Sequence, residues 1–505
     1  MGMLSDEERN SLIAAETAAA ATPVPTQVVS SDEFMPIAQT ERQKKVEARM
    51  NALADDYGAR NGLSRRRFFQ TAAGMATAFV AMNEVYGPLY GAAPAEARSV
   101  DLAQARASSL ADQFVMDVHT HFLRDDTRLE GFVRGREAVG KAGWNPELAG
   151  KPQTLEDLKY ANWFKEVYLD SDTKVALISS SPSEEPRDWF LTNDMVADAR
   201  TKVNAGAGSR RCLAHAVFTP GMPGWLDDVD RAIALKPDSW KGYTVGDNTN
   251  KDLARHPWRM DDEKLVYPFY EKILKAGHDI VCVHKGLYPP STEQRWPNLT
   301  PYATADDVGK AAKDWPQIRF VIYHSAFRWT GAPGAASDGY AQFEKTGRVE
   351  WTSDLADIPA KYGVSNVYAD LGQIFAQTTV VEPRLCAALM GMLVKGMGAD
   401  HVVWGTDAVW TGAPQWQIEA LRRLEIPEEM RRKHGFAELG PADGPIKRAI
   451  FGGNSAQMYK YEVKKAAWRD DRFAAIKADY QQRGPDPSNL RYGFVVPGED
   501  HATRT

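Results

Sequence analysis

Four of the chain's ten histidines follow short apolar runs, and one aspartate ends a similar run near the C-terminus. These residues are His119, His121, His284, His324 and Asp407. His119 and His121 are two positions apart, so on a strand their side chains point to the same side. Two such imidazoles can bind one divalent ion, with a third nitrogen from His284 and a carboxylate oxygen from Asp407. A bound ion of this kind activates water at neutral pH, which predicts hydrolytic chemistry.

Short apolar runs recur along most of the chain and precede these polar residues. The runs occupy residues 114–119, 174–179, 212–218, 242–245, 280–284, 319–324, 367–370 and 401–405. Uninterrupted apolar segments of this length are typical of parallel strands covered on both faces. Longer amphipathic stretches lie between them, such as 261–277, whose final glycine suits a helix stop. Eight strands alternating with helices predict an α/β fold, a (β/α)8 TIM barrel.

The carboxyl ends of barrel strands meet at one cavity, so this fold would bring the five polar residues together. Other interpretations stay open for each residue alone. His119 and His121 could be ordinary surface histidines, His324 a hydrogen-bonded core histidine, and Asp407 the cap of the next helix. Asp370, at the end of the seventh run, suits a supporting role. A doubly wound sheet is the alternative fold, but no Gly-x-Gly-x-x-Gly pattern opens the first unit.

Together these segments resemble the amidohydrolase superfamily, in particular the branch that includes amino-carboxymuconate-semialdehyde decarboxylase and aromatic-acid decarboxylases. The resemblance spans residues 112–462 and rests on Asp117-Val-His-Thr-His121, Val283-His284, Tyr323-His324-Ser325, Gly405-Thr-Asp407 and Ile450-Phe-Gly-Gly-Asn454. It implies a distorted (β/α)8 barrel with one divalent metal ion, most commonly Zn²⁺, with Mn²⁺ as the alternative. The implied ligands are His119, His121, His284 and Asp407. His324 would act beside the ion as an acid, a base or an oxyanion-stabilising group.

The same resemblance bears on the number of metal ions. Binuclear members of the superfamily bridge two ions with a carbamylated lysine at the end of the fourth strand. In this sequence Lys241 precedes the run 242–245, so we expect it at the opposite end of that strand, as a solvated lysine. The resemblance therefore implies one ion rather than two.

Residues just past the strand ends should line the mouth of the barrel. They include Lys285, Tyr288, Arg328 and Trp410. A cation beside aromatic rings would suit a small carboxylated, aromatic or cyclic substrate. Loop packing or a surface charge is the alternative for each residue, and Arg328 is the strongest candidate for binding a carboxylate.

Three functions are consistent with these residues. The first is a metal-dependent hydrolase in which Asp407 moves a proton and His324 stabilises an oxyanion. The second is a metal-dependent decarboxylase of an aromatic or unsaturated carboxylic acid, in which His324 or Asp407 protonates the carbon that loses CO2. The third is an exported barrel that binds a metal without catalysis. A homo-oligomer is compatible with all three.

Composition excludes several other classes of function. Lys and Arg number 61 against 67 Asp and Glu, which gives a net charge of −6, and no long basic run offers a site for nucleic acid or an anionic membrane. Three widely spaced cysteines predict neither a disulfide framework nor a thiolate zinc site. No apolar run approaches the roughly 18 residues of a membrane-spanning helix. A small-molecule substrate is the expected partner.

The first hundred residues differ from the barrel in composition. Residues 1–63 are predicted to form a flexible lead. Residues 64–97 begin with Ser64-Arg-Arg-Arg-Phe-Phe, continue with a modestly apolar stretch and end in small residues, which resembles a bacterial twin-arginine export signal. Export of the folded protein through recognition of this leader by the export machinery, followed by cleavage after Ala97, would leave a periplasmic protein with its barrel at 98–462 and a C-terminal extension at 463–505. The alternative is a basic helix start followed by a buried helix.

Overall fold

The computed structural model describes residues 22–27, 38–127, 155–247, 249–328 and 335–484, and a few positions between 128 and 142. Within them, eight parallel strands form one sheet in sequence order. The strands are β1 (Met116–Thr120), β2 (Val175–Ile178), β3 (Cys212–Val217), β4 (Ser239–Tyr243), β5 (Ile280–His284), β6 (Arg319–Tyr323), β7 (Val367–Asp370) and β8 (Val402–Val403). The predicted (β/α)8 barrel is confirmed.

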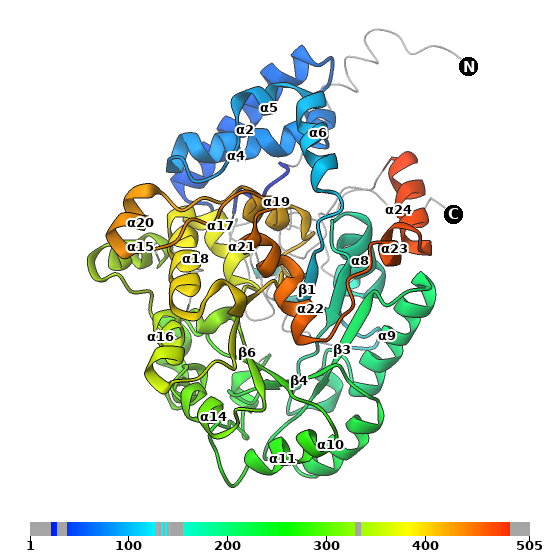
Figure 1. Cartoon of the computed structure of the whole chain (residues 1–505), viewed down its shortest axis with the longest axis vertical. Helices are drawn as coiled ribbons and strands as arrows, with labels where there is room; N and C mark the ends of the chain where they lie inside the picture. The colour runs from blue at the N-terminus through cyan, green and yellow to red at the C-terminus, as the bar shows by residue number, and fades with distance from the viewer. Residues whose placement is uncertain are drawn as a thin grey trace.

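Helices surround this sheet, as Figure 1 shows. Those between the strands are α8 (Tyr160–Phe164), α9 (Asn193–Ala207), α10 (Trp225–Ala234), α11 (Tyr267–Lys275), α12 (Pro290–Arg295), α13 (Thr300–Ala303), α14 (Val308–Asp314), α15 (Ala335–Thr346), α16 (Thr352–Tyr362), α17 (Ile374–Val381) and α18 (Pro383–Met397). After β8 come α19 (Gln415–Arg423), α20 (Glu428–His434), α21 (Pro445–Arg448), α22 (Asn454–Met458), α23 (Ala466–Arg469) and α24 (Arg472–Gln482). No helix among the described residues combines the length and apolarity that crossing a membrane requires.

Seven of the predicted runs coincide with strands, and the fourth is displaced. The sequence predicts this strand at 242–245, whereas β4 begins at Ser239. Ser239 and Lys241 made the start of the strand look polar, yet both side chains are fully buried. Lys241 therefore lies in the middle of β4, and its prediction as a solvated lysine at the far end of the strand is wrong.

The barrel closes between its first and last strands. Val118 N donates a hydrogen bond to Trp404 O at 3.0 Å, and Asp407 N donates one to His119 O at 2.9 Å. A further bridge joins Thr120 to the residue that follows Asp407. This closure places the segment after β8 directly beside the His-Thr-His segment of β1.

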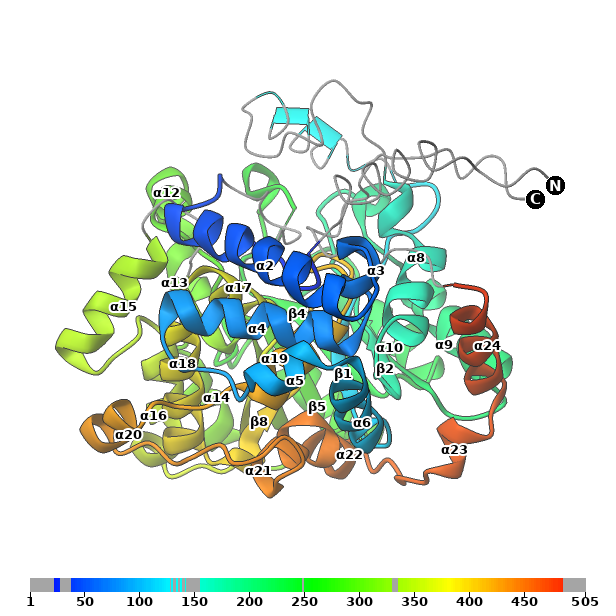
Figure 2. The ribbon, with the colours of Figure 1, turned by 90° about the horizontal axis from the view of Figure 1, so that it is seen from above.

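Helices before the barrel form an N-terminal layer, residues 41–110. They are α2 (Glu41–Arg60), α3 (Arg65–Phe69), α4 (Ala72–Tyr86), α5 (Pro94–Arg98) and α6 (Val100–Leu110). Figures 1 and 2 show this layer in blue, packed on the side of the barrel that carries α17, α18 and α19. Its buried residues belong to the same hydrophobic cluster as the residues under those helices.

The segment that resembles an export signal lies within this layer. Ser64 caps α3, and Phe68 at the end of its arginine run is fully buried. In α4, the side chain of Phe79 is also fully buried, and the guanidinium of Arg423 lies over its ring. This geometry corresponds to the alternative interpretation, a basic helix start followed by a buried helix. Export and cleavage stay a prediction.

Helix α19 joins the N-terminal layer to the barrel through buried charges. Glu419 accepts hydrogen bonds from Arg106 of α6 and from Arg422 and Arg423 of its own helix, at 2.8 to 3.1 Å. Arg423 also binds Glu96 of α5. Helix α19 begins soon after the segment that contains Asp407. It therefore connects the N-terminal layer to the side of the barrel mouth that carries Asp407.

Candidate metal centre

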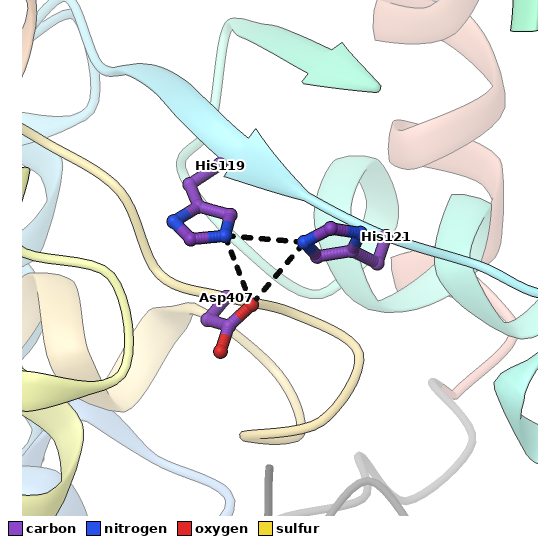
Figure 3. A group of neighbouring side chains, drawn as sticks. All are labelled: His119, His121 and Asp407. Carbon is purple, nitrogen blue, oxygen red and sulfur yellow. Dashed lines mark hydrogen bonds and ion pairs between the residues drawn. The ribbon is translucent and has the colours of Figure 1, made fainter. Parts of the chain in front are cut away.

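Three side chains predicted as metal ligands meet at the carboxyl end of the barrel: His119 and His121 from β1, and Asp407 after β8 (Figure 3). The Nε2 atoms of the two histidines are 3.1 Å apart. Asp407 Oδ1 lies 3.2 Å from Nε2 of His119 and 3.5 Å from Nε2 of His121. Donor atoms with this spacing fit one divalent ion, whose bonds to nitrogen and oxygen are about 2.0–2.2 Å. All three side chains are buried.

Strand β1 reaches this geometry through a local irregularity. From Asp117 to Thr120 it advances three residues while β2 advances two, so β1 carries one extra residue. A bulge of this kind redirects the side chains beside it. Asp117 fixes the segment, because its carboxylate accepts hydrogen bonds from the amide and hydroxyl of Thr406 at 3.1 and 2.5 Å. The same carboxylate accepts one from the His119 amide at 3.1 Å.

Two residues of the site have left-handed backbone conformations, which L-residues rarely adopt. The φ angle is 63° at Asp407 and 61° at His324. Such conformations persist where the surrounding structure over-determines them, and they cluster at functional sites. The amino-acid sequence gives no indication that either residue has a left-handed backbone conformation.

Asp370, at the end of β7, supports His119 from behind. Its Oδ2 lies 2.8 Å from His119 Nδ1, and it also accepts hydrogen bonds from the amides of Gly372 at 3.0 Å and His324 at 3.3 Å. A carboxylate at Nδ1 holds the proton there and leaves Nε2 as the lone-pair nitrogen, the arrangement typical of metal-binding histidines. Asp370 thus has the supporting position that its place in the sequence suggested.

Two glycines allow this close approach. A Cβ on Gly405 would lie 2.1 Å from Asp370 Oδ1 and 2.7 Å from His119 Cβ. A Cβ on Gly372 would lie 2.3 Å from His119 Nδ1. Any side chain at either position would displace the histidine or its carboxylate.

The other two predicted histidines form a neighbouring pair. His284 Nδ1 lies 3.0 Å from His324 Nε2, and His324 Nδ1 lies 3.0 Å from the carbonyl oxygen of Gly372. That carbonyl requires the proton on His324 Nδ1, so His284 donates through its own Nδ1 and its Nε2 is the lone-pair nitrogen. The His324 ring lies 4.9 Å from the His119 ring, centre to centre. Among the described residues, His284 is not part of the group formed by His119, His121 and Asp407, and its role as a ligand stays a prediction.

Burial keeps all four histidines in the neutral form that binds metals. It holds the pKa of His119, His121, His284 and His324 well below the usual range, and the charge of Lys241 lowers each pKa further. Burial also raises the pKa of Asp117 and of Asp370 to about 7. The cluster is therefore rich in neutral nitrogen donors, with carboxyl groups around it.

The Tyr323 ring contacts both Lys241 and His119. Lys241 Nζ lies 3.3 Å from the centre of the Tyr323 ring, and the His119 ring centre lies 3.9 Å from the same point. The lysine thus contributes a buried positive charge close enough to lower the pKa of His119.

A chain of hydrogen bonds below the site holds Tyr323 in place. Its hydroxyl donates to Val118 O at 2.5 Å and accepts from His215 Nε2 at 2.7 Å. His215 Nδ1 lies 2.8 Å from Ser239 Oγ, which lies 3.1 Å from the hydroxyl of Tyr459. Sequence reasoning missed this chain. A histidine inside the apolar run 212–218 was the available signal.

The predicted substrate residues have different surroundings. Lys285 is fully buried and its Nζ lies 2.9 Å from both carboxylate oxygens of Asp307. The Tyr288 hydroxyl donates to a backbone carbonyl at 2.6 Å. Arg328 binds Glu293 and Glu350 and lies over the Trp351 ring. These contacts engage Lys285 and Arg328 with carboxylates of the protein itself, and substrate binding by either residue stays a prediction.

Trp410 lies beside the candidate metal centre. The centres of its ring and the His121 ring are 6.0 Å apart. Phe190 completes the cluster, 5.3 Å from Trp410 and 6.0 Å from His121, centre to centre. We call Phe190 and Trp410 the aromatic wall. Sequence reasoning identified Trp410 and missed Phe190, because the loop after β2 carries no chemical signature.

Several solved structures have a similar chain path. An uncharacterised TIM-barrel protein from Bordetella bronchiseptica is 11% identical, with 69% of this chain and 98% of that chain covered and a TM-score of 0.44. 5-Carboxyvanillate decarboxylase from Sphingomonas paucimobilis is 11% identical, with 69% and 99% covered and a TM-score of 0.39. 2,6-Dihydroxybenzoate decarboxylase from Rhizobium is 13% identical, with 69% and 99% covered and a TM-score of 0.38. Identities this low do not transfer a substrate or a reaction from one chain to another.

A comparison by sequence gives a narrower result. No curated protein matches the chain. Residues 230–461 match the family described as amidohydrolase. The matched segment runs from within α10 to beyond α22 and includes His284, His324 and Asp407, whereas His119 and His121 precede it.

Proposed function

We propose that this chain is a member of the amidohydrolase superfamily and a divalent-metal-dependent decarboxylase of a small aromatic carboxylic acid. The observation that carries the proposal is the contact between the candidate metal centre and the aromatic wall. His121 takes part in both, through Nε2 toward Asp407 and through its ring beside Trp410 and Phe190. A planar ring stacked on this wall would lie next to the metal ligands.

The protein supplies the ion with a fixed set of donors. His119 and His121 offer Nε2, Asp407 offers Oδ1, and we propose His284 Nε2 as a further ligand. Neutral imidazole and carboxylate are donors that suit Zn²⁺ and also Mn²⁺. When bound, such an ion acts as a Lewis acid that polarises an oxygen of the substrate. Metal analysis of the purified protein would identify the ion.

Decarboxylation also requires a proton. The bond from the ring carbon to the carboxylate breaks, CO2 leaves, and a C–H bond forms at the same carbon. Asp407 and His324 are the titratable groups that we propose for holding and delivering that proton. Asp407 lies within the group of donors, and the His324 ring lies beside the His119 ring, with their centres 4.9 Å apart.

The experiment is turnover of metal-loaded protein with a panel of hydroxylated and methoxylated benzoates in D2O. We expect CO2 in the headspace and one deuterium on the product ring at the carbon that lost the carboxylate. Asp407→Asn should abolish both signals. Absence of CO2 from the whole panel, at full metal occupancy, would contradict the proposal.

Hydrolysis is the second candidate. It is favoured by one observation: Oδ1 of Asp407 faces both histidines, where a carboxylate is able to accept a proton from a water molecule. A panel of cyclic esters and amides tests it in the same assay. Release of an acid without CO2 would identify a hydrolase and overturn the decarboxylase proposal.

A further inference from the structure

A cleft of about 510 Å³ lies between the N-terminal layer and the barrel helices α15 and α18. Figure 2 shows the start of α2 and the end of α4, which line the cleft, beside these two helices. The volume is within the range of small-molecule sites, roughly 300–1,000 Å³. None of the residues that line the cleft belongs to the candidate metal centre or to the aromatic wall. The cleft is therefore a separate place in which a small molecule fits.

Charged side chains of both signs line this cleft. The positive ones are Arg42 from α2 and Arg384 from α18, and the negative ones are Glu344 from α15 and Glu382 just before α18. Their charges sum to zero, so a molecule of one sign meets repulsion as well as attraction. A molecule that carries both signs matches the lining better.

Glu382 is a buried carboxylate that is only half engaged. Its side chain is 4% exposed, and its Oε2 accepts a hydrogen bond from Arg42 Nη1 at 3.1 Å. Its Oε1 has no hydrogen-bond partner among the described residues. Burial raises the pKa of Glu382 although Arg42 and Arg384 act in the opposite direction. The carboxylate therefore lacks part of the positive charge and hydrogen bonding that burial of an anion requires.

Arg42 leaves this carboxylate accessible to a ligand. Its side chain is 62% exposed, and exposed side chains change rotamer within nanoseconds. A ligand that carries an ammonium group can therefore approach Glu382 while the arginine keeps or yields its own hydrogen bond.

Arg384 offers donors two residues further along the chain. Its Nε donates to Tyr86 O at 3.1 Å, and its Nη1 lies 4.0 Å from Glu429, which is longer than a hydrogen bond. The Tyr340 hydroxyl is a further neighbour. A guanidinium has more N–H groups than these contacts use, and it binds a carboxylate through two parallel hydrogen bonds.

We propose that this cleft binds a small zwitterion, with its ammonium group on Glu382 and its carboxylate on Arg384. A free amino acid is the simplest molecule of this class. Tyr86 and Tyr340 line the same cleft, and their rings suit the hydrocarbon part of such a ligand. The site involves neither the metal ion nor the proposed reaction, so it is independent of the proposed function.

The test is calorimetric binding and thermal denaturation of the full-length, metal-loaded protein with 2-aminopentanoate and 5-aminopentanoate. Pentanoate and pentylamine are the matched compounds with a single charge. We expect at least one aminopentanoate to bind about tenfold tighter than either of them and to raise the melting temperature, because the walls of the cleft belong to both the layer and the barrel. Equal binding of a single-charge compound, or no binding of either aminopentanoate at millimolar concentration, would overturn the proposal.

Two variants locate the binding site. Glu382→Gln and Arg384→Gln should each weaken the aminopentanoate by about tenfold or more, the effect of one lost hydrogen bond to a charged group. Unchanged affinity in both variants would place the ligand elsewhere, for example on the metal ion, and would contradict the site. Arg384 is partly exposed, so Arg384→Gln tests the cleft even where Glu382→Gln fails to fold.

Glu84→Gln is the matched control. Glu84 belongs to α4 and pairs with Arg49 of α2, as Glu382 pairs with Arg42, but it does not line the cleft. This variant should bind the aminopentanoate as wild type does. A loss of affinity equal to that of Glu382→Gln would show a general effect of the layer and would remove the support for a site in the cleft.

Discussion

At the scale of single residues, His119 is the best-defined donor of the site. Asp370 fixes its Nδ1 and the Tyr323 ring covers one face, so Nε2 is directed to His121 and Asp407. A ligand whose orientation is set before metal binding loses less conformational entropy on binding. The arrangement therefore fits a resident ion rather than an occasional one.

Substitution of single histidines should distinguish the proposed metal ligands from His324. We expect His121→Ala and His284→Ala to lose the ion, and His324→Ala to keep it while turnover falls by about 10²–10⁴. Metal content by mass spectrometry and turnover are the measurements. His401→Ala, at the opposite end of β8, is the control and should match wild type. Full metal occupancy in His284→Ala would remove His284 from the ligand set.

Gly405 offers a test of the packing behind His119. In Gly405→Ala the new methyl group would meet Asp370 Oδ1 and His119 Cβ at 2.1 and 2.7 Å, so one of them must move. We expect weaker metal binding, by about tenfold or more, as seen for disrupted partners of metal ligands. A competition titration with a chelator measures it. Gly339→Ala is the control, because the nearest atom to its Cβ position is Leu385 Cδ2 at 3.6 Å, an ordinary contact distance. Wild-type affinity in Gly405→Ala would contradict the expected displacement.

At the scale of elements, the hydrogen-bond chain through β3, β4 and β6 joins the floor of the barrel to β1. Tyr323→Phe keeps the ring beside His119 and removes the hydroxyl that bonds Val118 O and His215 Nε2. Leaving these buried groups unpaired should lower the free energy of unfolding by about 1–3 kcal/mol. Urea denaturation measures this change. We expect metal affinity to fall less in Tyr323→Phe than in Tyr323→Leu, which also removes the ring, and the reverse order would contradict the positioning role of the ring.

The charges on α19 predict a pH dependence. Burial alone would raise the pKa of Glu419, but Arg422, Arg423 and Arg106 outweigh it and hold the pKa below its ordinary value of 4.5. The lowered pKa means that this stabilisation is complete above pH 4.5 and is lost as the pH falls further. The thermal stability of the protein should therefore fall below that pH, and limited proteolysis should cleave the N-terminal layer faster. Glu419→Gln should show the same cleavage at pH 7, and resistance of this variant to the protease would contradict the role of Glu419.

The elements differ in how well the sequence predicts them. Seven strands were predictable because both faces of each are apolar, and the meeting of His119, His121 and Asp407 followed from barrel topology. The start of β4 was not, because Ser239 and Lys241 are polar residues that point into the barrel and find partners there.

At the scale of the whole molecule, the N-terminal layer is joined to the barrel by core packing, ion pairs and backbone hydrogen bonds. Gly91 N donates to Arg423 O, and Glu425 N donates to Leu89 O, both at 2.7 Å. Gln417 of α19 in turn donates to Thr411 Oγ1 at 2.9 Å, in the segment just after Asp407. The layer therefore supports the part of the barrel mouth that supplies the carboxylate ligand.

A variant that begins at Arg98 tests whether this layer is needed. It removes Phe68, Phe79 and Met82, each of which contributes about 1.5–3 kcal/mol when buried, and this sum is comparable to the roughly 5–15 kcal/mol of a typical domain. It also removes Glu96, the partner of Arg423. We expect this variant to aggregate or to unfold at a much lower temperature than the full chain, measured by solubility and thermal denaturation.

The same variant bears on export, because cleavage of the predicted leader after Ala97 would produce that chain. A variant that begins at Thr22 is the control for shortening the chain. It retains the whole N-terminal layer, so we expect it to keep the stability and metal content of the full chain. N-terminal sequencing of protein from the periplasm of an expressing cell completes the test. If the exported protein keeps residues 64–97, the leader-like segment is a permanent structural layer that exposes no cleavage site once folded. A folded, metal-loaded protein that begins at Arg98 would instead show that the barrel is stable alone and that the segment is a removable signal.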